Sequence, residues 1–439
     1  MSLGNTSRPW EHAGMRIVSG RLLVAGRDAE ALAREHGTPL YVYDLRRIGE
    51  QAGALREALV RAGLTPRVRL AMKALREAPV LRFLRGLGAP GEPTAVGIDS
   101  CSPGEVLHAL ECGFLPEEIS YTGTNVSARD LDVIAPLPLH VNVDLLTQID
   151  RVGRRCPGRA VGLRLNPRAG VMRGHAQSLY SGAKPTKFGI YDEDLEQAVA
   201  RAAHHGLTLD TAHFHLANGM LDDELPAFDE ALSVAALMVR RLVDAGCPLQ
   251  EVNVGGGLGT PLHDGERPLD LDAYADILAR HFGDLGVAIG VEPGEFLTNE
   301  AGLLLAEVVT VEQRMATTFV GLDCGWNVMN DHLAYGRELE FVVCVRADAA
   351  PAQRVTVAGH INEGNDLFAE DVPFPEVVEG DVVAMVSVGG YCHSMWTDHC
   401  GRPRAGVLFF EDRGQTGRRR GVGPAPATLP VHCVGGEVQ

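Results

Sequence analysis

Short apolar runs alternate with amphipathic stretches along the first 300 residues. In the segment 44–60, apolar residues recur at three- and four-residue steps, which predicts a helix with one buried face. Asp44 precedes this helix and is placed to cap its first turn. Eight apolar runs predict strands between helical stretches: Val68–Met72, Ala95–Ile98, Ile119–Tyr121, His140–Val143, Gly162–Leu165, Thr211–Leu216, Val252–Val254 and Ala288–Val291.

Eight strand–helix repeats are typical of an α/β fold of the (β/α)8 TIM-like barrel type. The long interval between the fifth and sixth runs requires an insertion. An open, doubly wound parallel sheet is the alternative architecture for the same pattern.

The pattern changes after residue 302. The stretches LLLAEVVTVEQ, TTFVGLDCG, ELEFVVCVRA, RVTVAGH, DVVAMVSV and AGVLFF follow one another with turn signals and almost no helical spacing. They predict a C-terminal all-β, Greek-key-like domain. The alternating N-terminal stretch MRIVSGRLLVAG is expected to add a strand to that domain, so that the barrel is an insertion between two parts of it.

These patterns divide the chain into four parts. We expect residues 1–44 to join the β domain, 45–302 to form the barrel, 303–412 to form the β domain, and 413–439 to be a flexible tail rich in Gly, Pro and Arg.

The composition and net charge limit the classes of molecule that the protein is expected to bind. The 439 residues are 45% hydrophobic and 22% charged, as in ordinary soluble proteins, and carry a formal net charge of −17. An acidic chain is poorly suited to nucleic acid or anionic membranes, which favours a small-molecule partner. Nine cysteines without a C-x-x-C pair suggest reduced thiols, and no apolar leader or run of roughly 18 to 20 apolar residues occurs. We therefore expect a cytoplasmic protein.

Chemically versatile residues fall at the ends of the predicted strands, where barrel enzymes bind ligands. They are Lys73, Asp99, Asn142 or Asp144, Arg164, His213, His215 and Glu292. A lysine at a barrel mouth can form an imine when desolvation lowers its pKa. Taken alone, Lys73 is better explained as a solvated lysine at a strand end, and it is the whole set of residues that favours chemistry.

Two further motifs follow strands. Gly255, Gly257 and Gly259 give G-x-G-x-G rather than the dinucleotide fingerprint, although their exposed N–H groups could cradle a phosphate. His213 and His215 are two apart and are expected to share one face of a strand. They could bind zinc or stack on a planar cofactor; because no third ligand has a recognisable spacing, we predict no metal site.

Taken in order, these motifs resemble the fold-type III pyridoxal-phosphate decarboxylases, the group that acts on diaminopimelate, ornithine and arginine. The resemblance covers residues 38–412, through TPLYVYD, AMKA, GIDSCSPGE, LRLNP, TKFGI, HFHLANG, VNVGGGLG, EPGE, LDCGWN, INEGNDLF and GGYCHSM. It implies a pyridoxal 5'-phosphate enzyme that decarboxylates an amino acid.

The resemblance also implies residue roles. Lys73 forms the internal aldimine, His215 stacks on the pyridine ring, and Glu292 pairs with the ring nitrogen. A carboxylate there keeps the nitrogen protonated, so the ring can accept electrons when a bond at Cα breaks. The remaining cofactor contacts implied are Asn218, Gly256, Gly257, Gly294 and Tyr391 at the phosphate, with Asp99 and Arg164 near the ring.

A homodimer is implied as well, with the partner supplying the segment INEGNDLF to each active site. Glu363 in this segment is implied to be catalytic and to contact substrate. Asp323 and Asp366 match acidic positions near the far end of the substrate. Solvated loop carboxylates are the alternative explanation for all three.

The chain departs from the pattern at the position of the family's proton-donating cysteine, which is Asn362 here. An amide has no proton to give near neutral pH. If Asn362 occupies this catalytic position, His393, Cys392 or water must protonate the intermediate, or its fate differs.

Three other departures touch the same pocket. Glu295 stands where an arginine is expected after EPG, Ala217-Asn218 replaces Gly-Ser, and Asn330-Asp331 replaces Arg-Pro. A glutamate would be repelled by a phosphate, so Glu295 is expected either to point away or to contact a cationic part of the substrate. The departures favour an unusual substrate of specialised biosynthesis.

Three hypotheses follow. The first is decarboxylation of an amino acid or an amino-acid-derived intermediate through Lys73. The second keeps the cofactor but changes the reaction, to racemisation or decarboxylation-coupled deamination. The third is a non-catalytic decarboxylase homologue, which has no reason to keep Lys73, Glu292 and the glycine loop together.

Overall fold

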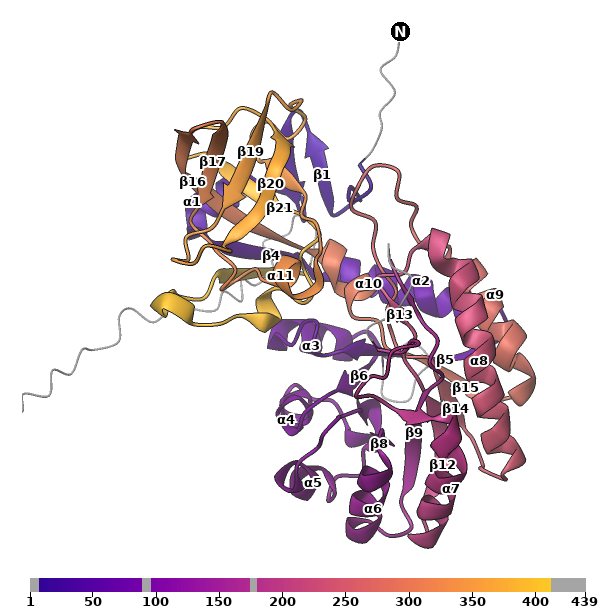
Figure 1. Cartoon of the computed structure of the whole chain (residues 1–439). Coiled ribbons are helices and arrows are strands. Elements are labelled where there is room, and N and C mark those ends of the chain that lie inside the picture. The colour runs from indigo at the N-terminus through magenta and orange to yellow at the C-terminus, as the bar shows by residue number, and fades with distance from the viewer. Residues whose placement is uncertain (1–7, 89–95, 174–179, 412–439) are drawn as a thin grey trace, which may run out of the picture.

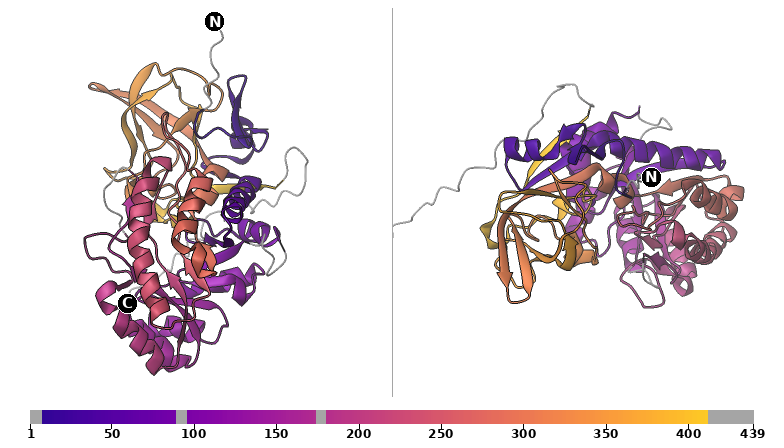
Figure 2. Two further views of the ribbon diagram at one scale, coloured as in Figure 1. Left: turned by 90° about the vertical axis from the view of Figure 1, so that its right-hand side faces the viewer. Right: turned by 90° about the horizontal axis from the view of Figure 1, so that it is seen from above.

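The computed structural model describes residues 8–88, 96–173 and 180–411. They form a barrel and a second, mostly stranded part, which lie beside each other in the views of Figures 1 and 2.

Eight parallel strands close into a barrel. Each pairs with its neighbours, β8 pairs with β9, and β15 pairs back with β5, so no edge is left open. This confirms the barrel and excludes the open sheet. The strands are β5 (Thr65–Ala71), β6 (Gly97–Ser100), β7 (Ile119–Tyr121), β8 (His140–Val143), β9 (Ala160–Asn166), β12 (Thr208–His213), β14 (Glu251–Asn253) and β15 (Ala288–Val291).

A helix follows each barrel strand, and another precedes the first. They are α2 (Leu45–Arg61), α3 (Ala78–Arg85), α4 (Pro103–Glu111), α5 (Ala128–Ile134), α6 (Leu146–Arg155), α7 (Leu195–His204), α8 (Leu225–Asp244), α9 (Leu271–Phe282) and α10 (Glu295–Thr298). In α2 the predicted apolar face is buried, and the Asp44 carboxylate accepts from the Arg46 N–H as expected.

Three of the eight predicted runs match the observed strands β7, β8 and β15 in both bounds, and the other five are shifted or extended by one to three residues. Strand β12 ends at His213, so His215 lies in the following loop and the two histidines do not share a strand face. Strand β6 extends to Ser100. The predicted insertion follows β9 and contains β10 (Val171–Met172) and β11 (Ile190–Tyr191); β10 pairs with β13 (Ala217–Asn218).

The second part contains an eight-stranded sheet built around β16. Its members are β4 (Leu40–Asp44), β16 (Gly302–Arg314), β17 (Thr317–Leu322), β18 (Phe341–Val343), β19 (Gln353–Ala358), β20 (Leu367–Phe374), β21 (Val382–Met385) and β22 (Gly406–Phe410), with the short helix α11 (Asp331–Tyr335) between β17 and β18. Strand β4 pairs with β16 and β22, so chain on both sides of the barrel builds one sheet.

The N-terminal stretch 15–26 packs on the stranded part as predicted, with the Leu22 N–H donating to the Cys344 carbonyl at 2.9 Å, but it does not pair as a strand of this sheet. It folds into the hairpin β1 (Met15–Val18) and β2 (Arg21–Val24), which with β3 (Arg27–Asp28) makes a separate three-stranded sheet beside helix α1 (Ala29–His36). Ser19 and Gly20 both have positive φ, which suits a two-residue hairpin turn. The predicted tail 413–439 lies outside the described residues.

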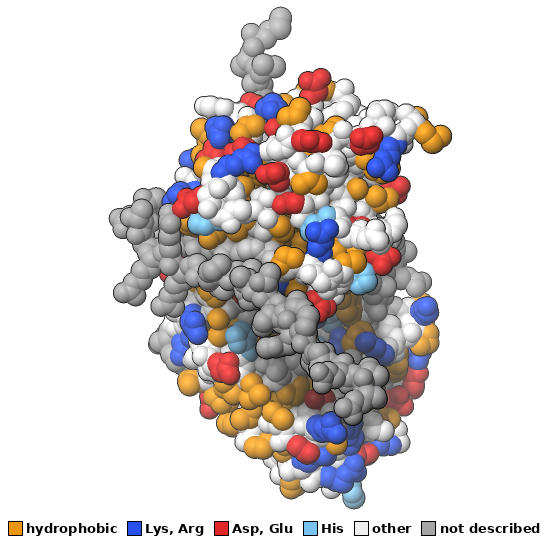
Figure 3. All heavy atoms as spheres, turned by 90° about the vertical axis from the view of Figure 1, so that its left-hand side faces the viewer, with side chains coloured by type: hydrophobic (Ala, Val, Ile, Leu, Met, Phe, Trp, Pro, Cys, Tyr) orange, Lys and Arg blue, Asp and Glu red, His pale blue; other side chains and the backbone are white. Residues whose placement is uncertain are grey.

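Charges are interspersed on the face shown in Figure 3, where neither Lys and Arg nor Asp and Glu form a broad area of one sign. Within the described ranges, no helix is long and apolar enough to cross a membrane.

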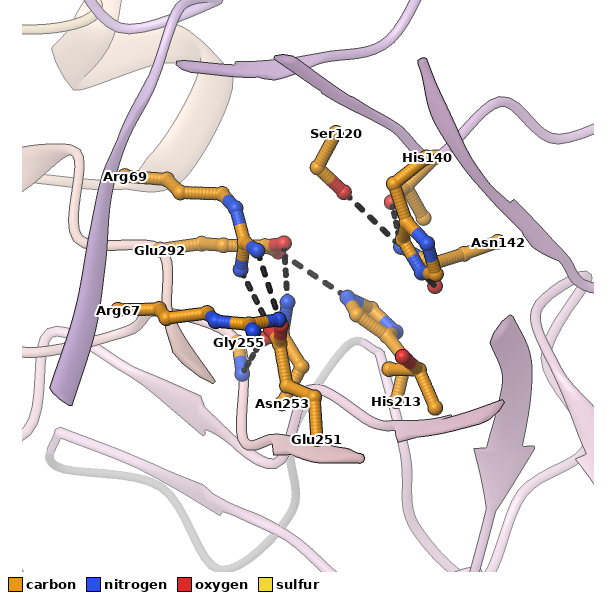
Figure 4. A network of polar contacts seen from close by, with 12 residues as sticks. Arg67, Arg69, Ser120, His140, Asn142, His213, Glu251, Asn253, Gly255 and Glu292 are labelled. Atoms are coloured by element: carbon orange, nitrogen blue, oxygen red, sulfur yellow. Dashed lines mark hydrogen bonds and ion pairs between the residues drawn. The ribbon is translucent and has the colours of Figure 1, made fainter. Parts of the chain in front are cut away.

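A buried ion pair crosses the barrel interior. Arg69 of β5 donates to Glu251 of β14 at 2.5 and 2.9 Å, and Arg67 donates to the same carboxylate at 2.6 Å (Figure 4). The guanidinium can reach across because β15 has Gly290 here; a Cβ on that glycine would lie 2.2 Å from Glu251 Oε1. Burial raises the pKa of Glu251, but Arg69 and Arg67 outweigh it and hold that pKa at about 2.

We predict that Glu251→Gln lowers the free energy of unfolding by about 3 kcal/mol, because it leaves the Arg69 guanidinium buried without its carboxylate. Denaturant unfolding near neutral pH measures this. The wild-type contribution is present above the ordinary pKa of 4.5 and is lost as pH falls through about 2. Glu196→Gln, at an exposed pair with Arg241, is the control and should change stability by less than about 0.5 kcal/mol. Equal stability of the two variants would contradict this account.

Candidate active site

A cavity of about 430 Å³ opens at the C-terminal ends of the barrel strands, against loops of the second part of the chain. It brings together most of the residues that the sequence predicted for the site. Those lining it are Lys73, Asp99, His215, Asn218, Gly256, Gly257, Glu292, Glu295 and Tyr391.

Lys73 follows β5 and presents its amine to this cavity. Burial lowers the pKa of Lys73, but the acidic groups of Cys101, Tyr391 and Asp99 outweigh burial, and the pKa lies above the ordinary 10.5. The expectation of a lowered pKa was therefore wrong for the protein without its cofactor. The amine here is a charged group among acidic neighbours.

Glu292 directly follows β15 and is held by a buried polar network (Figure 4). Its Oε2 lies 3.0 Å from His213 Nε2, and its Oε1 accepts from the Asn253 amide at 2.6 Å. Burial raises the pKa of Glu292, but His213, Arg69 and Asn253 lower it to about 2. The network therefore presents an ionised carboxylate, suited to hold a proton on a ring nitrogen.

The glycine loop and His215 form another wall. The Gly256 N–H donates to His215 Nδ1 at 3.1 Å, which fixes the orientation of the imidazole. Burial, helped by Lys73 and Arg164, puts the pKa of His215 well below 6.5, so the ring is neutral. A Cβ at Gly257 would lie 2.0 Å from the Ala217 carbonyl, and its φ is +95°, so glycine is required there.

The two histidines therefore have different surroundings. His213 contacts Glu292, whereas His215 packs its ring 4.6 Å from that of Tyr180. Over the described residues, no group of three His, Cys, Asp or Glu is arranged to hold a metal.

Other predicted residues lie outside the cavity lining. Arg164 is buried, with its guanidinium carbon 4.5 Å from the Phe188 ring centre and its nitrogen 4.0 Å from Asp144. Gly294 precedes α10, where a Cβ would lie 2.3 Å from the Tyr391 hydroxyl. Gly294 thus allows Tyr391 to approach the cavity wall.

The acidic loop residues are also away from the cavity of this single chain. Asn362 and Glu363 are exposed, and Glu363 lies 3.1 Å from His399. Asp366 accepts from the N–H groups of Trp326 and Ile361, and Asp323 accepts from Thr38 and the Glu307 N–H. Within one chain, the last two carboxylates order loops of the stranded part, and their predicted substrate contacts stay predictions.

The alternative proton donors do not line the cavity either. The Cys392 thiol donates to the Gly390 carbonyl at 3.2 Å, and burial raises its pKa well above the usual value. His393 Nδ1 lies 3.2 Å from Glu77. Neither group is placed to protonate a substrate in the cavity.

Sequence reasoning missed several lining or supporting residues. Tyr180, Tyr335, Arg173 and Arg337 line the cavity, and Asn253 positions Glu292. Asn253 could have been recognised from the sequence, because it is a polar residue within the apolar run VNV directly before the glycines. The others come from loops and short elements whose position depends on tertiary packing.

A closed barrel with a lysine amine at its mouth, an ionised buried carboxylate in the same cavity and a second, stranded part defines a class of pyridoxal-phosphate barrel enzymes. Comparison with known proteins supports the assignment to this class. The family model described as "Pyridoxal-dependent decarboxylase, pyridoxal binding domain" matches residues 45–299. The chain belongs to this family of pyridoxal-dependent decarboxylases.

Relatives match over nearly their whole length. Diaminopimelate decarboxylase of Methanothermobacter thermautotrophicus is 34% identical, with 91% of this chain and 93% of the relative covered. That of Escherichia coli strain K12 is 31% identical, covering 88% and 91%. The crystal structure of diaminopimelate decarboxylase from M. jannaschii in complex with L-lysine superposes with a TM-score of 0.81 at 25% identity, covering 91% and 93%.

The chain is accordingly a pyridoxal-phosphate-dependent amino acid decarboxylase, and its residues fit the cofactor. The cavity offers an amine at Lys73, an ionised carboxylate at Glu292 and a glycine loop whose backbone leaves no room for a Cβ. Asp99 Oδ1 is buried and accepts no hydrogen bond from any described residue, which leaves a polar atom for a ligand.

We predict that Asn253→Asp weakens pyridoxal-phosphate binding by about tenfold. The new carboxylate lies beside Glu292, so like-charge repulsion raises the pKa of Glu292 and weakens its hold on a protonated ring nitrogen. Titrating the cofactor into cofactor-free protein, followed by protein fluorescence, measures the affinity.

Asn142→Asp is the matched control, because Asn142 is also buried in the barrel but bonds Ser120 and Thr122 instead of Glu292. Unchanged affinity in a folded Asn253→Asp protein would show that Asn253 does not act through Glu292.

Proposed function

We propose that the protein decarboxylates an amino acid, or an intermediate derived from one, in specialised biosynthesis, with Lys73 as the residue that carries the cofactor. One observation supports this most: the Lys73 amine and the Glu292 carboxylate, fixed by His213 and Asn253, line the same cavity. An amine for attachment and an anion for the ring nitrogen are the two groups that this chemistry requires.

Bound pyridoxal phosphate supplies an electron sink for the pair of electrons released at Cα. Glu292 then keeps a proton on the ring nitrogen, because its pKa is about 2 and it stays ionised. His215, whose Nδ1 accepts from the Gly256 N–H, would stack on the pyridine ring of the cofactor. We further propose that N–H groups of Gly256 and Gly257 and the hydroxyl of Tyr391 bind the phosphate, and that Asn218 assists them.

Protonation at Cα needs an acid other than the usual cysteine. Lys73 is the acid we propose, since its amine lines the cavity in which the substrate would bind. In this chain Asn362 is exposed, while Cys392 and His393 do not line the cavity. The proton therefore comes from a residue already at the reacting end.

A homodimer is part of the proposal. The segment 361–368 exposes residues 362–365, and Asn362 and Glu363 among them do not line the cavity of their own chain. A second copy that brought this segment to the cavity would add Glu363 to the substrate end. Asp323 and Asp366 would then shape the segment rather than contact substrate, since backbone N–H groups and Thr38 occupy their oxygens.

Lys73→Ala should abolish decarboxylation while the protein stays folded. The chain has three lysines, Lys73, Lys184 and Lys187, so attachment can be located directly. Borohydride reduction of the cofactor-loaded wild type should leave the cofactor mass on the Lys73 peptide. Lys184→Ala, which removes an exposed lysine, should keep both label and activity. Full turnover by Lys73→Ala would contradict the proposal.

Racemisation is the second candidate, favoured by Asn362 at the position of the usual acid. Incubation with a panel of L-, D- and diamino acids in heavy water separates the two. We expect products that have lost CO2 and carry one deuterium at Cα. Deuterium at Cα with the carboxylate retained would replace decarboxylation by racemisation.

A further inference from the structure

We propose that Glu295 is a specificity residue that selects substrates with a cationic group at the end far from Cα. This inference rests on the proposed function, because it concerns the same cavity. It follows from the charges of five lining side chains: Arg173, Glu266, Glu295, Asp331 and Arg337.

Arg173 is already occupied by protein groups. Its Nε donates to the Gly219 carbonyl at 2.7 Å, and Nη2 donates to the Thr260 carbonyl at 2.9 Å. Its Nη1 lies 3.4 Å from Glu266, closer than the 3.7 Å between Arg173 and Glu295. Arg173 is therefore a fixed part of the wall, and Glu266 is its nearer carboxylate.

Arg337 is occupied in the same way. It donates to Asp331 at 3.3 Å and to the Ser387 carbonyl at 2.8 Å. Burial raises the pKa of Asp331 to about 6; Arg337 opposes this shift, and Glu295 adds to it. Asp331 and Glu295 are thus close enough to repel each other, and Arg337 partners the former.

Glu295 is the less completely paired charge, because it shares Arg173 with Glu266, which lies nearer to that guanidinium. Glu295 Oε1 accepts from the Thr260 N–H at 3.2 Å, and its Oε2 accepts no hydrogen bond from the residues that the structure describes. Among these five side chains the carboxylates outnumber the guanidinium groups by one, and Glu338, which also lines the cavity, lies 3.3 Å from His263. A largely buried carboxylate that shares its cation with a nearer carboxylate is incompletely compensated, and a substrate cation would complete its pairing.

The same wall disfavours a substrate whose far end carries only a carboxylate. Such a group would meet Glu295 and Asp331, while the nearest partners of the two guanidinium groups are already Glu266 for Arg173 and Asp331 for Arg337. The fitting class is an α-amino acid with a distal ammonium or guanidinium. This assignment makes Glu295, placed by the first turn of α10, the residue that distinguishes a cationic far end from a neutral one of equal length.

Ligand pairs that differ in one charge test the inference without turnover. We would measure binding of 1,5-diaminopentane and 1-aminopentane to the cofactor-loaded protein by calorimetry. The wild type should bind the diamine about 10- to 100-fold more tightly than the monoamine, as expected for a charge-assisted hydrogen bond in a buried site. In Glu295→Gln this ratio should fall toward one.

Glu312→Gln is the matched control, because it removes one negative charge from an exposed position on β16 and should keep the wild-type ratio. Turnover of L-lysine against L-norleucine gives the second readout, and in Glu295→Gln KM should rise more than kcat falls.

The outcomes separate the two proposals. A ratio near one in the wild type, or a ratio unchanged by Glu295→Gln, would overturn the role of Glu295. Absence of decarboxylation of any amino acid by wild-type protein that shows the diamine preference would instead overturn the proposed function.

Discussion

The ionised Glu292 carboxylate in the barrel interior is the constraint on which the site depends. A buried carboxylate ordinarily takes up a proton, and here His213, Asn253 and the more distant Arg69 prevent that. Arg69 is itself held by Glu251, and the absent side chain of Gly290 lets that pair form across a neighbouring strand. Polar residues from β5, β12, β14 and β15 thus act together, which explains why a barrel interior contains so many charged groups (Figure 4).

Closure of the barrel brings the reacting groups together from distant parts of the chain. Lys73 follows the first barrel strand, and Glu292 follows the last, yet β15 pairs with β5. The loop that carries Tyr391 reaches the cavity because β4 and β22 anchor the stranded part beside the barrel. The insertion of the barrel between β4 and β16 is therefore what allows both parts of the chain to line one cavity.

Most of the barrel strands and several residues of the candidate site were predictable from the sequence. The apolar runs predicted the eight strands because most residues of these strands are buried, and the order of motifs indicated Lys73, His215 and Glu292. The hairpin at Ser19-Gly20 was missed because alternation alone does not show which sheet a strand joins. The pKa of Lys73 was predicted in the wrong direction, since sequence shows burial but not the acidic groups that surround the amine. Arg173 and Arg337 went unnoticed because short elements and loops, positioned by tertiary contacts, bring them to the cavity.

The protonation state of the bound cofactor tests the central claim most directly. Nuclear magnetic resonance of pyridoxal phosphate labelled with a heavy nitrogen isotope in its ring, bound to the wild-type protein, reports whether that nitrogen carries a proton. The account predicts a protonated ring nitrogen at neutral pH in the wild type, and loss of that proton in Glu292→Gln. An unprotonated nitrogen in the wild type would show that Glu292 does not serve the cofactor as proposed.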